Sequence, residues 1–386
     1  MKIIYSSASK LGGVGLANVV NHAVHGIYRV GYLNKAVVYG NRQQEVPSSF
    51  VKIIRFQPTK IFSSLSSRYY YSMKKMWFDY RTSMFIKNNT CDIFHGWTHE
   101  CLNSIKEAKK KGMITIVERG YCHPLYSKMI LDEEYKRMGI KRHPEGKRLL
   151  KKYDHWHREE TAALEEFDEA DYVIVNSSFA EETFLQNGFP KNKLKMIPRG
   201  VDTDYYKPAP ENDDLFRVVF VGMLCIRKGV HCLLEAWKKL NLKNAELVLV
   251  GAIHGEIKPV LEKYYSIKNI KITGFVENPA KLYNSASLFV FPSLDEGSAK
   301  VNYEAMACGL PVITTPNAGS LVIDGVDGFV IPIRDVEAII EKTRLLYENR
   351  EMLKQMGESA RKNIESYTWQ RYEESLVNFY DSLIRN

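Results

Sequence analysis

Long hydrophobic runs are absent from this sequence of 386 residues. Its longest apolar stretches, such as "YVIVN", "LVLVG" and "SLFVFP", are far shorter than the ~20 residues that span a bilayer. The opening "MKIIYSSASK" lacks a basic start, a following apolar stretch and a small-residue cleavage site. We therefore expect a cytoplasmic protein with neither a transmembrane helix nor a secretory leader.

Cysteine is also sparse, and the six cysteines form no C-x-x-C pair and lie beside no His cluster. This spacing suits neither a zinc site nor a disulfide framework, so we expect reduced, mostly buried thiols. The sequence has no repeat of fixed period and no low-complexity tract. With 386 residues, of which 45% are hydrophobic, the chain is long enough for two cores, and we expect two domains.

Positive charge is concentrated in the N-terminal part. Residues 1–150 contain 25 Lys and Arg against 10 Asp and Glu, a difference of +15, whereas residues 151–386 contain 29 against 35, a difference of −6. A basic surface attracts phosphate groups on nucleic acids, anionic lipids or charged small molecules. Charge alone does not distinguish these partners.

Short apolar segments alternate with helical patterns along the chain. Most are continuous apolar runs, which are typical of parallel strands covered by helices on both faces. Two series of β-α-β units predict an α/β fold with two doubly wound, Rossmann-like domains. We place them at 1–200 and 201–366, with 367–386 crossing back as a helix, because Gly, Pro and acidic residues interrupt the pattern at 199–214. The predicted strands are 2–6, 35–40, 52–56, 92–96, 114–118, 172–176, 195–198, 216–222, 245–251, 270–274, 287–292, 310–315 and 328–332.

The stretch "EGSAKVNYEAMACGLPVITT" (296–315) places two glutamates eight residues apart. It follows a predicted strand and is typical of a loop, a helix that ends near Gly309, and another strand. Glu296 then precedes the helix, and Glu304 lies about two turns inside it. The amides of residues 298–300 and the helix dipole favour an anion there, and the carboxylates accept hydrogen bonds from hydroxyls. A nucleotide sugar fits this arrangement, while a capped helix with two solvated glutamates is the alternative.

The same stretch resembles the E-x7-E signature of the family 4 retaining glycosyltransferases, which have the GT-B fold. Other segments are similar to this family in the same order: 170–208 to its interdomain segment, 220–237 to its phosphate-binding strand, turn and helix, and 324–332 to its closing strand. The resemblance is dense from about 170 to 335. Upstream it is limited to short pieces such as "GGVGLANVV" and "ITIVERGYCHP".

The resemblance implies that Glu304 holds the donor ribose and that Glu296 holds the transferred sugar. Arg227 and Lys228 would bind the diphosphate, since their charges suit a departing nucleoside diphosphate; a solvated basic turn is the alternative. Gly12 and Gly13 would let the backbone approach the donor phosphate or the acceptor. The implied catalytic set is Glu296, Arg227, Lys228 and His123, and the implied donor-binding set is Glu304, Gly297, Ser298, Ala299, Lys300, Val301, Gly222, Gly13 and Gly12.

Three departures from the family pattern affect the expected site. Met223 follows Gly222 where many relatives have an arginine, so Arg227 must carry more of the charge. Lys300 ends a Gly-Ser-Ala-Lys segment where many relatives have Gly-Phe-Gly-Leu, and one hypothesis is that it favours an acidic sugar or an extra phosphate. The frequent cleft His of the family falls at Glu118 or Arg119, which become acceptor or cleft candidates. His123 in "RGYCH" is the substitute candidate, with a structural role as the alternative.

The resemblance also implies a metal-independent reaction without a cofactor, with retention of anomeric configuration by front-face attack. "DTD" (202–204) has the Asp-x-Asp spacing of metal sites in another glycosyltransferase fold, but that fold's strand pattern does not precede it. The expected reaction transfers a hexose-type sugar from a nucleoside-diphosphate sugar to a glycan, lipid-linked or small-molecule acceptor. A sugar-nucleotide epimerase and a non-catalytic sugar- or nucleotide-binding protein are the alternatives.

Residues 60–87 combine apolar side chains at helical spacing with basic residues. A helix lying on an anionic membrane, giving peripheral attachment at the cytoplasmic face, is one interpretation. An ordinary core-packing helix is the other, and we favour it. No nucleic-acid partner is expected. The apolar residues of the pattern are Phe62, Leu65, Tyr69, Met73, Met76, Tyr80 and Met84.

Overall fold

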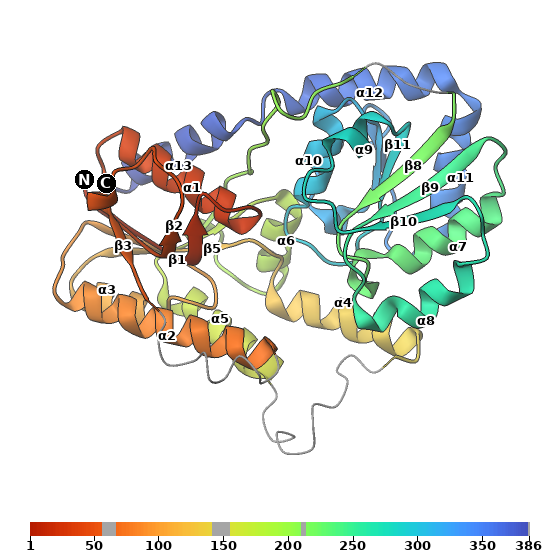
Figure 1. The fold of residues 1–386 in the computed structure, drawn as a ribbon. Coiled ribbons are helices and arrows are strands. Elements are labelled where there is room, and N and C mark those ends of the chain that lie inside the picture. Colours follow the sequence, from red (N-terminus) through yellow and green to blue (C-terminus); the bar gives the residue numbers. More distant parts are fainter. Residues whose placement is uncertain (56–66, 141–154, 210–213, 385–386) are drawn as a thin grey trace.

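The computed structural model describes residues 1–55, 67–140, 155–209 and 214–384, which form two α/β lobes (Figure 1). Among these residues, the first lobe contains a seven-stranded parallel sheet in the order β3-β2-β1-β4-β5-β6-β7. Its strands are β1 (Ile3–Leu11), β2 (Leu33–Asn41), β3 (Val51–Ile53), β4 (Ile93–Trp97), β5 (Ile114–Arg119), β6 (Tyr172–Val175) and β7 (Leu194–Met196).

The second lobe repeats the plan with a parallel sheet of six strands in its described part, in the order β10-β9-β8-β11-β12-β13. The order reverses direction between β8 and β11, where ligands of doubly wound sheets bind at the carboxyl ends of the strands. The strands are β8 (Phe216–Val221), β9 (Ala245–Val250), β10 (Ile270–Gly274), β11 (Leu288–Phe291), β12 (Val312–Thr314) and β13 (Gly328–Val330).

Each predicted strand is present, and the predicted α/β class with two Rossmann-like lobes is confirmed. The central strands are buried on both faces, as their continuous apolar runs require. β1 is longer than predicted and continues past Ser6 to Leu11, because Lys10 and Leu11 continue the pairing with Gly40 and Asn41 of β2.

Helices cover the faces of both sheets and connect their strands (Figure 1). In the first lobe they are α1 (Leu16–Arg29), α2 (Ser67–Lys87), α3 (Leu102–Lys110), α4 (Pro124–Arg137), α5 (His155–Glu169) and α6 (Ser178–Gln186). In the second they are the short 3-10 helix η5 (Ile226–Lys228), then α7 (Val230–Leu240), α8 (Lys258–Leu261), α9 (Ala280–Asn284), α10 (Lys300–Ala307), α11 (Val336–Glu348), α12 (Arg350–Ile364) and α13 (Trp369–Ile384).

In the described part of the chain, α13 and α4 cross between the lobes. α13 returns to the first lobe, as predicted, and Glu373 there contacts His22 and His25 of α1 at 3.0 and 3.2 Å. α4 follows a strand of the first sheet, but its Leu131 and Tyr135 belong to the hydrophobic cluster of the second lobe. Figure 1 shows α4 beneath the second lobe, close to α8. The domain boundary predicted near residue 200 assigns α4 to the first lobe and does not predict its packing on the second lobe.

α2 packs on the core of the first lobe, as the favoured interpretation of residues 60–87 expects, but through a different face from the one the listed residues define. Met76, Tyr80 and Met84 are exposed, while Phe78 and Ile86 on the other side of the helix are buried. Hydrophobic type and helical spacing do not fix which face turns inward when a helix has apolar residues on both faces. Phe62, Leu65 and the side chain of Tyr69 lie outside the described residues.

All six cysteines are free and buried, as predicted. Within the described ranges, we find no helix with the length and apolar character that crossing a bilayer demands.

Candidate active site

The first pair of predicted site residues meets at the carboxyl ends of β8 and β11. η5 follows β8 and ends at Lys228, whereas Glu296 lies in the loop between β11 and α10. The two side chains form an ion pair, and both are buried. Burial and the neighbouring charge of Arg227 lower the pKa of Lys228, while its contact with Glu296 favours the charged form.

Glu304 lies one turn inside α10, since the helix begins at Lys300; the expected two turns are therefore wrong. Its carboxylate is 2.7 Å from the Lys300 ammonium and accepts a hydrogen bond of 3.0 Å from the Tyr283 hydroxyl. Tyr206 faces the same carboxylate, and burial together with the charge of Glu304 raises the pKa of Tyr206. Glu304 is therefore buried among hydroxyl donors and one cation, and it is not solvated.

The loop between the glutamates is fixed by several contacts with the protein itself. The Ala299 N–H donates to the Ala318 carbonyl at 2.9 Å, so the prediction that this amide faces a ligand is wrong. Ser177 donates to the Gly297 carbonyl, and the Ser298 hydroxyl lies 2.9 Å from that of Tyr303. These contacts set the loop conformation before any ligand binds.

The β5–α4 loop of the first lobe covers the loop that carries Glu296. Tyr121 forms an antiparallel bridge with Gly297, and a Cβ atom on Gly297 would lie 2.4 Å from the Tyr121 Cα. Cys122 and Ser127 lie 2.9 and 2.7 Å from the two carboxylate oxygens of Asp295. Sequence reasoning missed these contacts; the signal for Asp295 was its position directly before Glu296.

Arg227 points toward the same covering loop. Its guanidinium lies 5.3 Å from the centre of the Tyr121 ring. Burial alone would lower the pKa of Arg227, but Tyr121 and Asp295 outweigh it and raise the pKa, so that the charge persists. Met223, at the position of the missing arginine, is exposed and adds no charge.

A cavity of about 220 Å³ lies between the lobes beside Lys300. It brings the predicted Gly13 together with Lys300, whereas its other walls were not predicted. Gly12 has φ +75°, and a Cβ atom there would lie 2.8 Å from the Gln43 backbone nitrogen, so glycine is required for the close turn. The cavity is lined by Gly13, Val14, Gly15, Asn18, Asp202, Tyr205, Tyr206, Lys300 and Trp369.

Gly222 and Val301 support the site from behind. Gly222 has φ +150° at the end of β8, and its carbonyl oxygen would lie 1.8 Å from a Cβ atom on Gly251, so these strand ends pack backbone to backbone. Val301 packs against the hydrophobic cluster of the second lobe. Asp202 of the "DTD" sequence accepts hydrogen bonds from the backbone N–H groups of Asp204 and Tyr205 at 3.1 and 2.9 Å.

His123 lies at the start of α4, where it is buried against Phe184, with ring centres 4.9 Å apart. Burial, with a smaller effect from the charge of Arg119, lowers its pKa to about 4. Its surroundings are those of a neutral core residue. The catalytic role proposed for His123 stays a prediction.

Glu118 belongs to a fully buried polar network that joins β5 to α13. It accepts hydrogen bonds from Asn176 at 3.1 Å and Tyr372 at 3.4 Å, and burial raises its pKa to about 7. Arg199 extends the network across the lobes, donating to Asn176 at 3.2 Å and to the Ser298 carbonyl at 3.4 Å. Glu118 is therefore connected through Asn176 and Arg199 to the loop that carries Glu296 (residues 292–299), which we call the donor loop because the sequence predicts donor binding there.

Arg119 lies at the carboxyl end of β5, where it contacts His99 at 3.3 Å and Glu160 at 3.5 Å. His99 itself has φ +74° and lies 3.5 Å from Glu160. His99 is thus a histidine at the strand ends of the first lobe that sequence reasoning missed, because its partners are distant in the chain.

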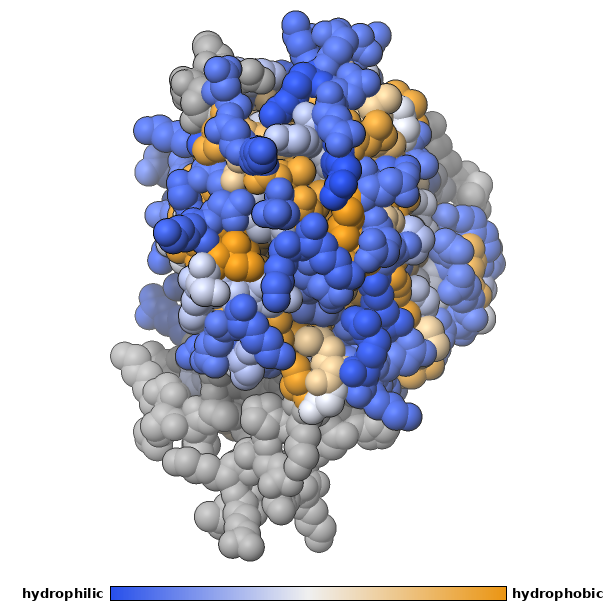
Figure 2. Space-filling model, turned by 90° about the vertical axis from the view of Figure 1, so that its right-hand side faces the viewer, coloured by the Kyte–Doolittle hydropathy of each residue, from blue (hydrophilic) through white to orange (hydrophobic). Residues whose placement is uncertain are grey.

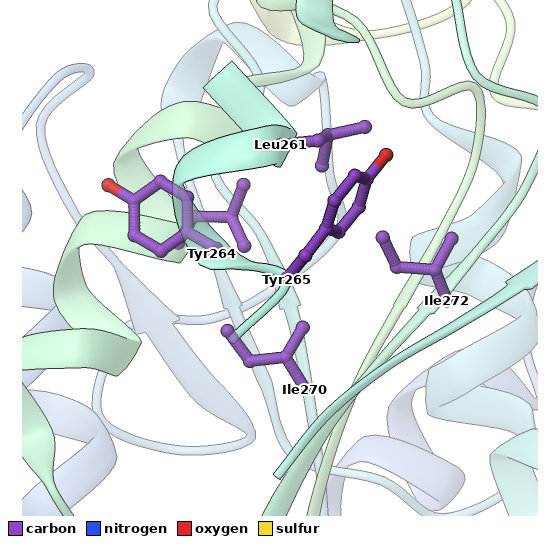
Figure 3. A pocket seen from close by; sticks show the side chains of 6 residues that line it. Leu261, Tyr264, Tyr265, Ile270 and Ile272 are labelled. Carbon is purple, nitrogen blue, oxygen red and sulfur yellow. The ribbon is translucent and has the colours of Figure 1, made fainter. Parts of the chain in front are cut away.

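A second cavity, of about 170 Å³, lies in the second lobe away from these residues (Figure 3). Tyr265, which follows the short 3-10 helix η7 (Glu262–Tyr264), and Ile272 of β10 project into it. The remaining walls are Leu234, Leu261, Tyr264 and Ile270. None of these side chains is charged. Figure 2 views the molecule from the side of the second lobe. Hydrophilic residues cover most of this surface, and hydrophobic residues are visible only in small areas.

Two adjoining family models match the chain. "Glycosyltransferase Family 4" matches residues 35–205, and "Glycosyl transferases group 1" matches residues 202–363. The two matches meet at the boundary between the sheets, so each lobe corresponds to one model.

Individual proteins agree with the models. The chain is 28% identical over 229 residues to the capsular polysaccharide biosynthesis glycosyltransferase CapM of Staphylococcus aureus, covering 55% of this chain and 60% of CapM. It is 27% identical over 241 residues to the lipopolysaccharide 1,2-N-acetylglucosaminetransferase of Salmonella typhimurium, covering 54% and 62%. The chain thus spans about 60% of the length of these curated relatives.

Solved structures match over the full length. Sucrose-phosphate synthase from Thermosynechococcus elongatus has a TM-score of 0.74 at 17% identity, covering 100% of this chain and 99% of that one. HepE from Anabaena in complex with UDP and glucose has a TM-score of 0.69 at 17% identity, covering 99% and 100%. At this identity the likeness establishes the fold.

Proposed function

The chain belongs to the family 4 glycosyltransferases, and from this we propose that it transfers a hexose-type sugar from a nucleoside-diphosphate sugar to a glycan, lipid-linked or small-molecule acceptor. The epimerase alternative is not favoured, since both family models describe glycosyltransferases. We place the protein in the cytoplasm as part of this proposal, since its six buried cysteines are free thiols.

One observation carries the proposal: two carboxylate–lysine pairs, Glu296 with Lys228 and Glu304 with Lys300, follow the strand ends of the second sheet. Of these residues, Lys300 faces Gly13 in the glycine turn of the first lobe across a cavity. Glu304 would accept hydrogen bonds from the donor ribose. Lys300, its neighbour in the cavity wall, is a point charge that turns easily toward a phosphate. HepE, which has the same fold, has a crystal structure in complex with UDP and glucose.

We assign the departing diphosphate to Arg227 and Lys228. Arg227 keeps its charge at every physiological pH, and its guanidinium offers planar donors to phosphate oxygens. In a covered site, such charges stabilise a leaving group more strongly than they do in water. Retention of configuration and independence from metals are parts of the proposal, and the departing phosphate would take the acceptor's proton.

A thermal-shift screen tests this function. UDP, GDP, ADP, CMP and their sugar conjugates are added without metal to the wild type, to Glu304→Gln and to the control Glu358→Gln, which changes an exposed glutamate. A ligand at ~100 times its Kd stabilises the fold by about 2.7 kcal/mol. Losing a hydrogen bond to a charged group costs about 1.5 to 3 kcal/mol, so Glu304→Gln should bind at least ~10-fold more weakly.

Glutamine still accepts the hydrogen bond from Tyr283, so the variant should fold. One nucleoside diphosphate should raise the melting temperature of the wild type and the control, and its sugar conjugate should then label an acceptor. The function fails if no nucleotide shifts the wild type, with or without metal, or if Glu304→Gln responds like the wild type.

A further inference from the structure

The outer face of α2 carries a stripe of large apolar side chains. Met76, Tyr80 and Met84 are 51%, 51% and 39% exposed, and residues four apart lie on the same side of a helix. Met73 lies beside them on this face and is partly exposed, and Trp77 lies at its border, packed in part against the inner hydrophobic cluster. An exposed row of this kind on a helix marks an interaction surface more often than chance exposure does.

A buried hydrogen-bond network fixes the rotation of α2 and so keeps the stripe outward. Asp79, on the inner face, accepts from the backbone N–H groups of Asn103 and Ser104 at 2.8 and 2.9 Å, and from both of their side chains. Phe78 and Ile86 are packed on the same inner side. Turning Met76, Tyr80 and Met84 inward would bury them only by exposing these groups and breaking the bonds of Asp79.

The charges on α2 are almost entirely positive. Arg81 and Lys87 are exposed, whereas Lys74 lies 4.4 Å from the centre of the Tyr39 ring and Lys75 acts on Glu100 of the first lobe. The one acidic residue of the helix, Asp79, is buried and hydrogen-bonded to α3. The Arg81 guanidinium lies 5.5 Å from the centre of the Trp77 ring, so cation and aromatic ring share one surface. Lys52 of β3 continues the positive charge next to α2, 6.0 Å from the ring of Phe85.

We propose that the outer face of α2 docks this protein onto the surface of an anionic lipid bilayer. Methionine and tyrosine side chains would enter the boundary between head groups and acyl chains, while Arg81 and Lys87 contact lipid phosphates. A single-stranded nucleic acid is the competing partner for basic and aromatic residues, but the thioether side chains of Met76 and Met84, on either side of Tyr80, offer no ring on which bases stack. The proposal does not depend on the sugar-transfer reaction.

Co-sedimentation with vesicles tests it, using neutral phosphatidylcholine and the same lipid with about one third phosphatidylglycerol. The stripe variant is Met76→Ser/Tyr80→Ser/Met84→Ser. The matched control is Tyr265→Ser/Phe275→Ser, which removes two side chains of the second lobe that are 60% and 74% exposed. The charge variant is Arg81→Gln/Lys87→Gln, and melting temperatures verify that each protein is folded.

The wild type and the control should sediment with the anionic vesicles at low salt and remain in the supernatant with the neutral ones. The stripe variant should bind the anionic vesicles at least ~10-fold more weakly. The charge variant should lose about five-fold in vesicle affinity for each charge removed. Added salt should weaken wild-type binding in the same way, because it screens these charges. The proposal is overturned if the wild type stays in the supernatant, if the stripe variant sediments like the control, or if a single-stranded oligonucleotide binds the stripe while vesicles do not.

Discussion

Glu134 of α4 tests how firmly this helix is attached to the second lobe. Its side chain is 0% exposed and lies 2.7 Å from Arg137, 2.8 Å from His231 and 2.5 Å from Arg334. His231 and Arg334 belong to the second lobe, so Glu134 is the charged centre of an interlobe contact. Replacement by glutamine keeps the shape of the side chain and removes its charge.

The size of the effect follows from the pKa of Glu134. Burial alone would raise this pKa, but the hydrogen bonds and charges of His231 and Arg137 outweigh burial and lower it to about 2 from 4.5. Each unit corresponds to about 1.4 kcal/mol, so the ionised form contributes about 3 kcal/mol at neutral pH. Glu134→Gln should lose an amount of that order, because it also leaves the buried cation of His231 without its partner.

Urea unfolding at pH 7 and hydrogen exchange of the peptide 124–137 measure this loss, with the exposed neighbour Glu133→Gln as the control. Because the folded-state pKa is lowered, the contribution is complete above pH ~4.5 and disappears as the pH falls toward 2. His231, with a pKa raised to about 9 by Cys232 and Glu134 against the effect of burial, adds stability that is lost as the pH rises from 6.5 through 9. A loss below ~1 kcal/mol, or α4 exchange equal to that of the control, would refute the reasoning.

Two further predictions concern the interlobe contacts. Burial raises the pKa of Glu118 to about 7, so the folded state binds its proton more tightly, and this residue's contribution to stability falls by about 3 kcal/mol between pH 4.5 and 7. In urea unfolding, the free energy of unfolding of Glu118→Gln should therefore rise relative to that of the wild type from pH 5 to pH 8. Parallel plots of this free energy against pH for the two proteins would contradict the prediction. In Gly297→Ala the new Cβ atom would lie 2.4 Å from the Tyr121 Cα and should push the covering loop away from the donor loop. The sugar-transfer rate should therefore fall further than in the control Gly255→Ala, where no atom lies within 4 Å of the new Cβ. Equal transfer rates for the two variants would contradict this prediction.

The sheets were predictable from the sequence because the signal for a buried parallel strand is local. Runs such as "FRVVFVG" and "AELVLVG" need only their own apolar residues and the following glycine to be recognised, and β8 and β9 lie where these runs predict. The pairing of Glu296 with the turn at Lys228 was also predictable, since both follow strands whose carboxyl ends meet at one edge.

The remaining contacts of the site depend on residues that are distant in the sequence and have no motif of their own. Tyr283 donates to Glu304 from α9, and Tyr121 reaches Gly297 from the other lobe. α4 has only a short apolar face, so no periodicity indicates that it packs on the second lobe. The rotation of α2 likewise depends on Asp79 and its partners on α3, which no spacing within α2 reveals.

These contacts explain how two carboxylates are accommodated in the interior eight residues apart. A buried unpaired carboxylate is strongly unfavourable, and each glutamate here faces a lysine: Glu296 faces Lys228 of η5, and Glu304 faces Lys300 one turn earlier on α10. Lysine is a flexible point charge, whereas Arg227 is held beside Tyr121. The lysines therefore serve the fold as counterions, and the proposed function uses the same two charges for the phosphates of the donor. For this reason, loss of either lysine should reduce stability as well as donor affinity. Glu296→Gln also leaves the buried Lys228 unpaired, so Glu304→Gln, which leaves the partly exposed Lys300 and keeps the bond from Tyr283, is the variant that separates the two effects.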